Sequence, residues 1–291
     1  FRMYSRSLSA LAFVADFPPA APEFHQRTHR VRLRNLGTTD KKSSHKIRHR
    51  KIPGEHIKSR EVSCMSGKYM AYVGSYSYTG KAKGITVFDV DVENGMFKER
   101  CEIEVDNSSY VIASSDGKTL YSIADEGVVS FRILPNGSLA RLNSAPIRGM
   151  RGCHLCTDEE DKYVFVSGYH DGKTTVLSLN PDGSVGKIVD GVFDRGYGSV
   201  AERNFRPHVT CTRRMPDNRF VLSVDNGIDQ VKIYRFNDKE QRLVQVDAIR
   251  CELESAPRHF RYSKDGKFIY LMYELKKAID VYTYKTGDRA P

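Results

Sequence analysis

Short runs of alternating apolar and polar residues recur along most of this chain, and they predict β-strands joined by tight turns. In the stretch Phe205–Phe236, an apolar run at 220–224 is followed by the turn DNGID at 225–229. The next run, QVKIYRF at 230–236, sets apolar side chains among basic ones. The glycine in the turn can adopt the positive φ that tight hairpins need. We therefore predict two antiparallel strands here, one half of a four-stranded unit.

The same half-unit occurs five times from Tyr69 onward. Its apolar strand, which we predict to be the inner strand of each unit, contains the segments YVGSY, YSIAD, FVSGY, VLSVD and YLMYE, beginning at Tyr72, Tyr121, Phe165, Val221 and Tyr270. The intervals between these starting points are 49, 44, 56 and 49 residues. Four of the strands follow a turn of one kind: SSDGKTL, DEEDKYV, MPDNRFV and SKDGKFI. An alternating strand comes after each apolar strand, so the chain is built from repeats.

A period of about 45–50 residues, with several short strands per period and almost no helical pattern, is typical of a β-propeller. Each blade is a twisted antiparallel sheet that buries its faces only when neighbouring blades stack against it. A β-solenoid and a β-sandwich are the alternatives. The period is too long for a solenoid coil, and repetition this regular is unusual in a sandwich. We predict an all-β fold, a β-propeller with about five blades in this chain.

Residues 1–64 differ from the rest of the chain, because they show no sustained strand or helix period and hold five of the nine histidines. Three interpretations are open: a transit-like presequence, a basic arm for nucleic acid, or sequence from outside the natural gene. We favour the third, because the chain begins with Phe and Met65 is a plausible native start just before a strand at 69–74. We expect disorder over residues 1–64 and a propeller domain over residues 65–291.

The distribution of charge changes the meaning of the overall basic balance. The chain has 46 Lys and Arg against 36 Asp and Glu, a formal net charge of +10. Residues 1–64 contain 14 basic and 5 acidic residues, which leaves 32 and 31 for the remainder. The body therefore lacks the basic patch of a nucleic-acid-binding protein. It also has no apolar run of about 18 residues, so we expect no membrane-spanning helix.

Cysteine usage favours a reducing compartment. The six cysteines are scattered, and only Cys153 and Cys156 have the CxxC spacing of metal or redox sites. No second CxxC pair follows, and the segment has the pattern of a strand rather than a zinc knuckle. We expect reduced, mostly buried thiols in a cytoplasmic protein, and no metal.

Several motifs in their order resemble a known family. These are YVGSYS with GITVFDVD, SSDGKTLYS, SGYHDG, RPHV with DNRFVLSVDNGIDQVKIYRF, and APRHFRYSKDGKFIYLMYEL. Together they resemble the lactonase propellers, a family that includes bacterial 6-phosphogluconolactonases and fungal carboxymuconate cyclases. The resemblance covers nearly all of the chain from Tyr69 to Tyr284 and implies a seven-bladed fold. About two blades and a final arginine-bearing motif of that family have no counterpart here. We therefore expect a chain of this length to be poorly soluble or inactive, because an open propeller exposes a blade face and a sheet edge.

Three residues are candidates for catalysis of lactone hydrolysis. This reaction needs a base to activate water, and a cation near the carbonyl oxygen as negative charge develops. His208, Arg258 and Glu274 lie 50 and 16 residues apart, about one blade and about one strand with its turn. The resemblance implies catalytic roles for the same His, Arg and Glu. We expect Glu274 or His208 to be the base and proton shuttle. We expect Arg258 to stabilise the oxyanion or to bind a substrate carboxylate or phosphate.

Each of these residues also has a structural interpretation. A histidine before a turn often bonds the backbone, Arg258 could pair with Asp225 or Glu274, and a glutamate at a strand end could be solvated. We add four candidate substrate-binding residues: His154, His170, Asp225 and His259. Asp225 could instead cap its own turn, as aspartates commonly do. No phosphate-binding loop, nicotinamide fingerprint or catalytic serine motif occurs, so we expect no cofactor.

The sequence therefore favours a sugar lactone hydrolase, with 6-phosphoglucono-1,5-lactone as the expected substrate. Its expected partner is a small phosphorylated or carboxylated lactone, without nucleic acid or membrane, and its oligomeric state is not predicted. Two alternatives are open. One is a carboxymuconate cyclase-type enzyme that forms the lactone, and the other is a propeller that binds a partner without catalysis.

Overall fold

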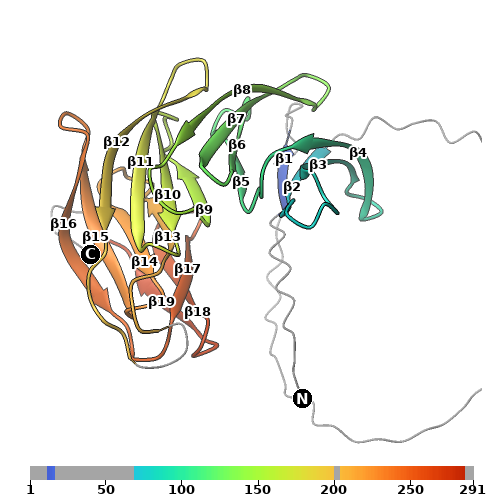
Figure 1. Cartoon of the computed structure of the whole chain (residues 1–291). Helices are drawn as coiled ribbons and strands as arrows, with labels where there is room; N and C mark the ends of the chain where they lie inside the picture. The colour runs from blue at the N-terminus through green and yellow to red at the C-terminus, as the bar shows by residue number, and fades with distance from the viewer. Residues whose placement is uncertain (1–11, 17–68, 200–203, 286–291) are drawn as a thin grey trace, which may run out of the picture. The chain divides into compact units, whose positions relative to one another are not determined.

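The computed structural model describes residues 12–16, 69–199 and 204–285, and over these residues it contains strands and no helix (Figure 1). The strands form five antiparallel sheets. The first sheet contains β1 (Ala12–Asp16), β2 (Tyr69–Gly74), β3 (Gly84–Asp91) and β4 (Met96–Glu104). The second contains β5 (Val111–Ala113), β6 (Thr119–Ile123), β7 (Gly127–Ile133) and β8 (Leu139–Pro146). The third contains β9 (His154–Thr157), β10 (Tyr163–Gly168), β11 (Lys173–Leu179) and β12 (Val185–Phe193). The fourth contains β13 (Val209–Arg214), β14 (Val221–Asp225), β15 (Gln230–Asn237) and β16 (Arg242–Arg250). The fifth contains β17 (Pro257–Tyr262), β18 (Phe268–Tyr273) and β19 (Ile279–Thr283).

Each sheet is a meander whose strands pair in chain order, which is the arrangement of a propeller blade. The first strands of neighbouring sheets contact one another: β5 contacts β1 and β9, and β13 contacts β9 and β17. The predicted all-β propeller with five blades in this chain is therefore confirmed. The first strands line the axis around which the blades are arranged.

The identity of the inner strands differs from the sequence prediction. The apolar strands that were expected to be innermost are β2, β6, β10, β14 and β18, and each is second in its sheet. In the third sheet the second strand is covered on both faces by neighbouring blades, and all six residues of β10 are buried. A continuous apolar run thus reports burial between blades. It does not report distance from the axis, and the true inner strands carry more polar residues.

The core consists of apolar clusters between adjacent sheets. Phe165 of β10 packs in one cluster with Tyr234 and Phe236 of β15, which joins the third blade to the fourth. Phe260 of β17 packs in another with Phe220, which joins the fourth blade to the fifth. Burying an aromatic or aliphatic side chain of this kind contributes about 1.5–3 kcal/mol relative to leaving it exposed. The blades are held together mainly by these contacts.

The recurring turn before the second strand has the same internal bonding in different blades. In SSDGKTL, the Ser114 hydroxyl donates to the Asp116 carboxylate at 2.7 Å, and Gly117 adopts a φ of 68°. In SKDGKFI, the Ser263 hydroxyl donates to the Asp265 carboxylate in the same way, at 2.5 Å. The turn chemistry that was read from the sequence is therefore what sets the start of the following strand.

The fifth sheet has one buried face and one exposed apolar face. Along β18, Ile269, Leu271 and Tyr273 are buried. The residues that alternate with them, from Phe268 to Met272, are exposed by 39–45% although they are large and apolar. The buried set packs on the fourth sheet. Strand residues alternate between the two faces, so the exposed set forms a continuous stripe on the other face. That stripe is Phe268, Tyr270, Met272, Ile279 and Val281.

Part of the basic N-terminal segment is ordered as a strand. β1 (Ala12–Asp16) pairs antiparallel with β2, with Ala12 opposite Val73 and Asp16 opposite Tyr69. It falls within residues 1–64, for which we expected disorder, so that expectation is wrong for these five residues. The rest of residues 1–64 lies outside the described residues. The first blade therefore takes its innermost strand from this segment.

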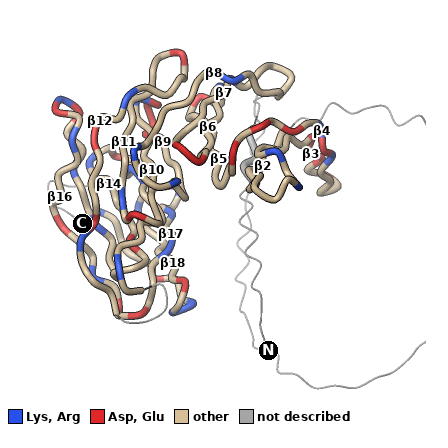
Figure 2. The backbone as a smooth tube through the Cα atoms, viewed as in Figure 1, with Lys and Arg blue, Asp and Glu red and all other residues tan. Residues whose placement is uncertain are grey.

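Charged residues of both signs are interspersed along the described strands and turns (Figure 2). This distribution agrees with the near balance of acidic and basic residues beyond residue 64. Within the described ranges, no helix is long and apolar enough to cross a membrane.

Candidate active site

The ion pair between Arg258 and Glu274 lies at one end of the inner strands. The Arg258 guanidinium donates to the Glu274 carboxylate at 2.7 Å, and the two side chains are 47% and 25% exposed. A register shift between Pro257 and His259 marks a β-bulge at Arg258, which re-aims its side chain. The backbone N–H of Glu274 donates to the Ala256 carbonyl at 2.8 Å, which fixes the carboxylate beside the start of β17. Both charged groups are therefore accessible to a ligand.

Asn226 connects this ion pair to the loop that carries His208. Its side-chain amide donates to Glu274 Oε2 at 3.4 Å, and its backbone N–H donates to the His208 carbonyl at 2.9 Å. Its own carbonyl accepts from the Asn204 side chain at 2.9 Å, and Asn226 is 1% exposed. The sequence analysis treated Asn226 only as a turn residue. A turn amide beside Asp225 was the available signal, but its contact with a residue 48 positions away could not be read from it.

His208 is held in a defined orientation. Its Nδ1 lies 2.6 Å from the Tyr169 carbonyl oxygen, and its ring stacks on the Tyr169 ring at a centroid distance of 4.3 Å. A carbonyl only accepts, so Nδ1 carries the proton and the Nε2 lone pair is available. Burial lowers the pKa of His208, and the positive charge of Arg206 acts in the same direction, although the Tyr169 carbonyl raises it. The neutral imidazole is thus favoured near pH 7.

The Asp225 side chain holds the loop of His208 through hydrogen bonds to its backbone. Its Oδ1 accepts the backbone N–H of His208 at 2.8 Å and that of Gly227 at 2.9 Å, and the residue is fully buried. The bond to Gly227 is the turn-capping contact that was the structural interpretation of this residue. Gly227 itself is required, because a Cβ there would lie 1.7 Å from the Arg206 carbonyl oxygen.

A second buried carboxyl faces Asp225. Burial raises the pKa of Asp225 to about 8, and the charge of the neighbouring Asp194 acts in the same direction. Asp225 is therefore protonated more readily than an exposed aspartate. Asp194 Oδ1 also accepts the Tyr234 hydroxyl at 3.0 Å and lies 3.7 Å from Lys232 Nζ. Asp194 was not singled out in the sequence.

The remaining candidates fall into different places. His170 is exposed in the turn after β10, edge-on to the Tyr169 ring at 5.4 Å. His154 and His259 instead contact each other, with ring centroids 5.2 Å apart. His154 begins the first strand of its sheet, just as His259 lies in the first strand of the fifth sheet. His170 follows the second strand of its sheet, as Glu274 does in the fifth.

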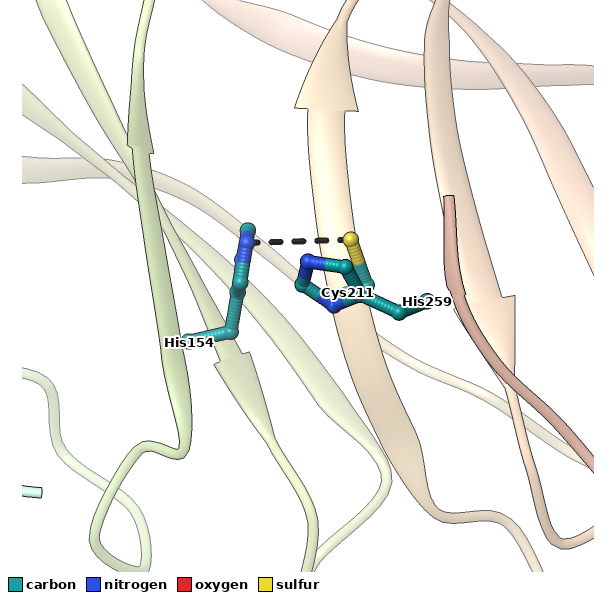
Figure 3. A group of neighbouring side chains, drawn as sticks. All are labelled: His154, Cys211 and His259. Atoms are coloured by element: carbon teal, nitrogen blue, oxygen red, sulfur yellow. Dashed lines mark hydrogen bonds between the residues drawn. The ribbon is translucent and has the colours of Figure 1, made fainter. Parts of the chain in front are cut away.

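His154, Cys211 and His259 form a cluster from β9, β13 and β17 (Figure 3). One ligand atom from each lies within 4.8 Å of the others, and His154 Nε2 is 3.7 Å from Cys211 Sγ. Imidazole and thiolate are ligands that zinc and copper accept. However, Arg213 Nη2 lies 3.2 Å from His154 Nε2 and occupies that lone pair. Burial lowers the pKa of His259 to about 3, with Arg261, Arg213 and Arg258 acting in the same direction. The surroundings are thus cationic, and the donor set fits a metal cation poorly.

The CxxC pair does not form a shared site. Cys153 Sγ donates to the Val209 carbonyl at 3.4 Å, and Cys156 Sγ donates to the Thr157 carbonyl at 3.1 Å. Residues three apart in an extended chain point to opposite faces, so these thiols diverge. Five cysteines are free in the described part of the chain: Cys101, Cys153, Cys156, Cys211 and Cys251.

Comparison with known proteins identifies the family. The model of the lactonase, 7-bladed β-propeller, matches residues 70–290. A 6-phosphogluconolactonase of Bacillus subtilis (strain 168) is 31% identical over 223 residues, covering 75% of this chain and 63% of the relative. A crystal structure from Bacteroides fragilis, assigned as a 6-phosphogluconolactonase, superimposes with a TM-score of 0.70 at 31% identity, covering 75% of this chain and 64% of that one.

A periplasmic gluconolactonase of Pseudomonas aeruginosa superimposes with a TM-score of 0.69 at 25% identity, covering 76% of this chain and 65% of that one. The chain thus spans less than two thirds of the length of these relatives. The match of the family model nevertheless extends over most of the described blades. This chain belongs to the lactonase family of seven-bladed β-propellers.

Proposed function

We propose that this protein hydrolyses a sugar lactone, with 6-phosphoglucono-1,5-lactone as substrate, at the site of His208, Arg258 and Glu274. The observation that carries the proposal is the linkage of the exposed Arg258–Glu274 pair to His208 through Asn226. The names of two relatives, from Bacillus subtilis and Formosa agariphila, support the choice of reaction.

In this mechanism His208 is the general base. The Nδ1 proton is held by the Tyr169 carbonyl, so the Nε2 lone pair takes the proton of an attacking water. The water oxygen bonds to the lactone carbonyl carbon, and the tetrahedral oxyanion forms. When the ring C–O bond breaks, the imidazolium returns its proton to the leaving oxygen. The products are the open-chain acid and a neutral His208.

Arg258 and Glu274 supply the charges that the reaction needs. The Arg258 guanidinium stabilises the oxyanion or binds the anionic group of the substrate. Glu274 fixes Arg258 and accepts a hydrogen bond from the water or a substrate hydroxyl. A substrate anion would compete with Glu274 for the Arg258 guanidinium. Substrate binding is therefore coupled to release of the Glu274 carboxylate from Arg258.

The supporting groups keep these residues in place. Asp225 and Gly227 hold the backbone at His208, and Asn226 holds Glu274. We propose positioning roles for Asp225 and Asn226 rather than contact with substrate, because their side chains bond the His208 backbone and Glu274. The five free thiols support a reducing, cytoplasmic location, whereas the Pseudomonas aeruginosa relative is named as periplasmic.

The experiment that tests the proposal measures acid release from 6-phosphoglucono-1,5-lactone and glucono-1,5-lactone above the buffer rate. The wild-type chain should accelerate hydrolysis, with the phosphorylated lactone preferred, and this result would also overturn the expectation that a chain of this length is inactive. Glu274→Gln, which keeps the side-chain shape and removes the charge, should lower the rate. Equal rates for buffer, wild type and Glu274→Gln would refute the enzyme proposal for this chain and favour a propeller that only binds.

A further inference from the structure

A cavity lies near the end of the inner strands that is opposite to the Arg258–Glu274 pair. It has a volume of about 410 Å³, and its lining includes Tyr110, Cys156, Arg213, Arg261 and Tyr262. Arg213 follows Cys211 by two residues on β13, and Arg261 follows His259 by two on β17. Alternate residues of a strand share a face and lie about 6.6–6.8 Å apart. The arginines therefore form a layer beyond the His154–Cys211–His259 cluster.

Arg213 is a partly buried cation with only neutral partners among the described residues, and Arg261 beside the same cavity is exposed. Its Nη2 lies 3.2 Å from His154 Nε2, and its Nη1 lies 3.7 Å from Cys156 Sγ. Its Nε is buried and has no hydrogen-bond partner within the described ranges. No described carboxylate lies within 4.0 Å of the Arg213 or Arg261 guanidinium.

The acidic residues at the cavity do not neutralise this charge. Asp158 lines the cavity, but its Oδ1 accepts the backbone N–H groups of Lys162 and Tyr163, and its Oδ2 faces Arg214 at 3.4 Å. Glu159 also lines it and is exposed. Burying a charge without a counter-ion is costly, so this arrangement calls for an anion from outside the chain.

The positive charges of Arg213 and Arg261 determine whether a cation or an anion fits beside the His154–Cys211–His259 cluster. A metal bound by the three side chains in Figure 3, His154, Cys211 and His259, would have to displace the Arg213 contact and lie beside two guanidinium groups. An oxyanion would instead accept hydrogen bonds from Arg213 and Arg261. Tyr110, which also lines the cavity, offers a further hydroxyl as a donor. Arginine binds phosphate and carboxylate groups in a bidentate manner, which suits this pairing.

We propose that the cavity lined by Arg213, Arg261 and Tyr110 binds the phosphate or carboxylate group of a small molecule, as a site separate from the candidate active site. The proposal does not depend on lactone hydrolysis. It rests on two unneutralised guanidinium groups at one cavity and on a buried Nε without a partner.

Isothermal titration calorimetry of the full chain tests the proposal, at pH 7 in a low-chloride buffer, with inorganic phosphate as the first probe. We expect saturable binding, and Arg213→Gln should weaken it by about tenfold or more, as expected when a buried charge pair loses one partner. Arg141→Gln is the matched control, because Arg141 is exposed on β8, away from the cavity. Gluconate and 6-phosphogluconate as further probes distinguish a carboxylate from a phosphate ligand.

Further variants keep the test decisive. If Arg213→Gln does not fold, Arg261→Gln and Tyr110→Phe should each weaken phosphate binding, and Arg213→Lys should retain part of it. Arg258→Gln can remove phosphate binding at the candidate active site, but it should leave in place the phosphate binding that depends on Arg213. Three results would overturn the proposal: no saturable anion binding, unchanged affinity in both Arg213→Gln and Arg261→Gln, or loss of all phosphate binding in Arg258→Gln. Stoichiometric Zn²⁺ binding without anion binding would also overturn it and favour the metal interpretation.

Discussion

The Asp225 carboxylate accepts the backbone N–H of His208 at 2.8 Å, across 17 residues of sequence, while its other oxygen is buried without a donor among the described residues. Burial and the charge of the neighbouring Asp194 raise the pKa of this carboxyl, which fixes the loop of His208. This relationship makes the position of His208 sensitive to the charge of a residue that no substrate touches.

The raised pKa of Asp225 predicts a specific pH dependence of stability. The folded-state pKa of Asp225 is raised from 3.8 to about 8, so the folded protein binds more protons than the unfolded chain between these values. The free energy of unfolding should therefore lose a contribution as pH rises from about 4 to 8, by at most about 1.4 kcal/mol per pH unit. Asp225→Asn keeps an acceptor for His208 and should remove this slope. Urea denaturation of both proteins at several pH values measures it, and parallel curves would contradict the raised pKa of Asp225.

The orientation of His208 predicts the acid limb of the pH–rate profile. Because burial lowers the pKa of His208, kcat/KM for lactone hydrolysis should stay high down to a pH below 6.5, the usual value for histidine. His208→Gln should lower kcat by about 10²–10⁴-fold and abolish that limb. A profile of the variant with wild-type shape would exclude His208 as the base.

Gly227 predicts a steric effect on the same loop. A Cβ at this position would lie 1.7 Å from the Arg206 carbonyl oxygen and 2.9 Å from His208 Cδ2. Gly227→Ala should therefore displace the loop and lower lactone hydrolysis more than Gly95→Ala changes it. Gly95 is an open turn position with nothing near its Cβ, although its φ of 65° makes that control mildly strained. Equal activity of the two variants would show that the loop tolerates the shift.

The exposed stripe of the fifth sheet predicts self-association. Met272 is 45% exposed and Ile279 61% exposed, and a large apolar surface favours association in water. Met272→Lys together with Ile279→Lys should reduce the apparent mass in light scattering with little change in stability. Leu271→Ala on the buried face should instead lower the free energy of unfolding by about 2–5 kcal/mol. An unchanged mass in the double variant would show that the stripe does not mediate association.

Local sequence chemistry predicted much of the fold. The apolar strands and the SSDGKTL-type turns are local features, and they placed the blades correctly because Ser114 bonds Asp116 within the turn itself. The innermost strands were misassigned because an apolar run reports burial and not position. β1 was missed because five residues such as AFVAD carry little signal without their pairing to β2.

The candidate site was predicted less completely, because its contacts cross the fold. The Arg258–Glu274 pair spans one hairpin and was considered from the sequence as an alternative. The contact between His154 and His259, 105 residues apart, depends on how three blades meet. Asp194 and Asp225 likewise belong to separate blades, and nothing in either local sequence indicates that the two carboxyl groups are neighbours.

The most direct test of the account is a double-variant cycle on 6-phosphoglucono-1,5-lactone hydrolysis, using Arg258→Gln, Glu274→Gln and the double variant. If the two residues act as one unit with His208, each single variant should lower kcat/KM by about 100-fold, and the double variant should fall little further. Single variants that retain the wild-type rate above buffer would contradict the assignment of the active site to this ion pair.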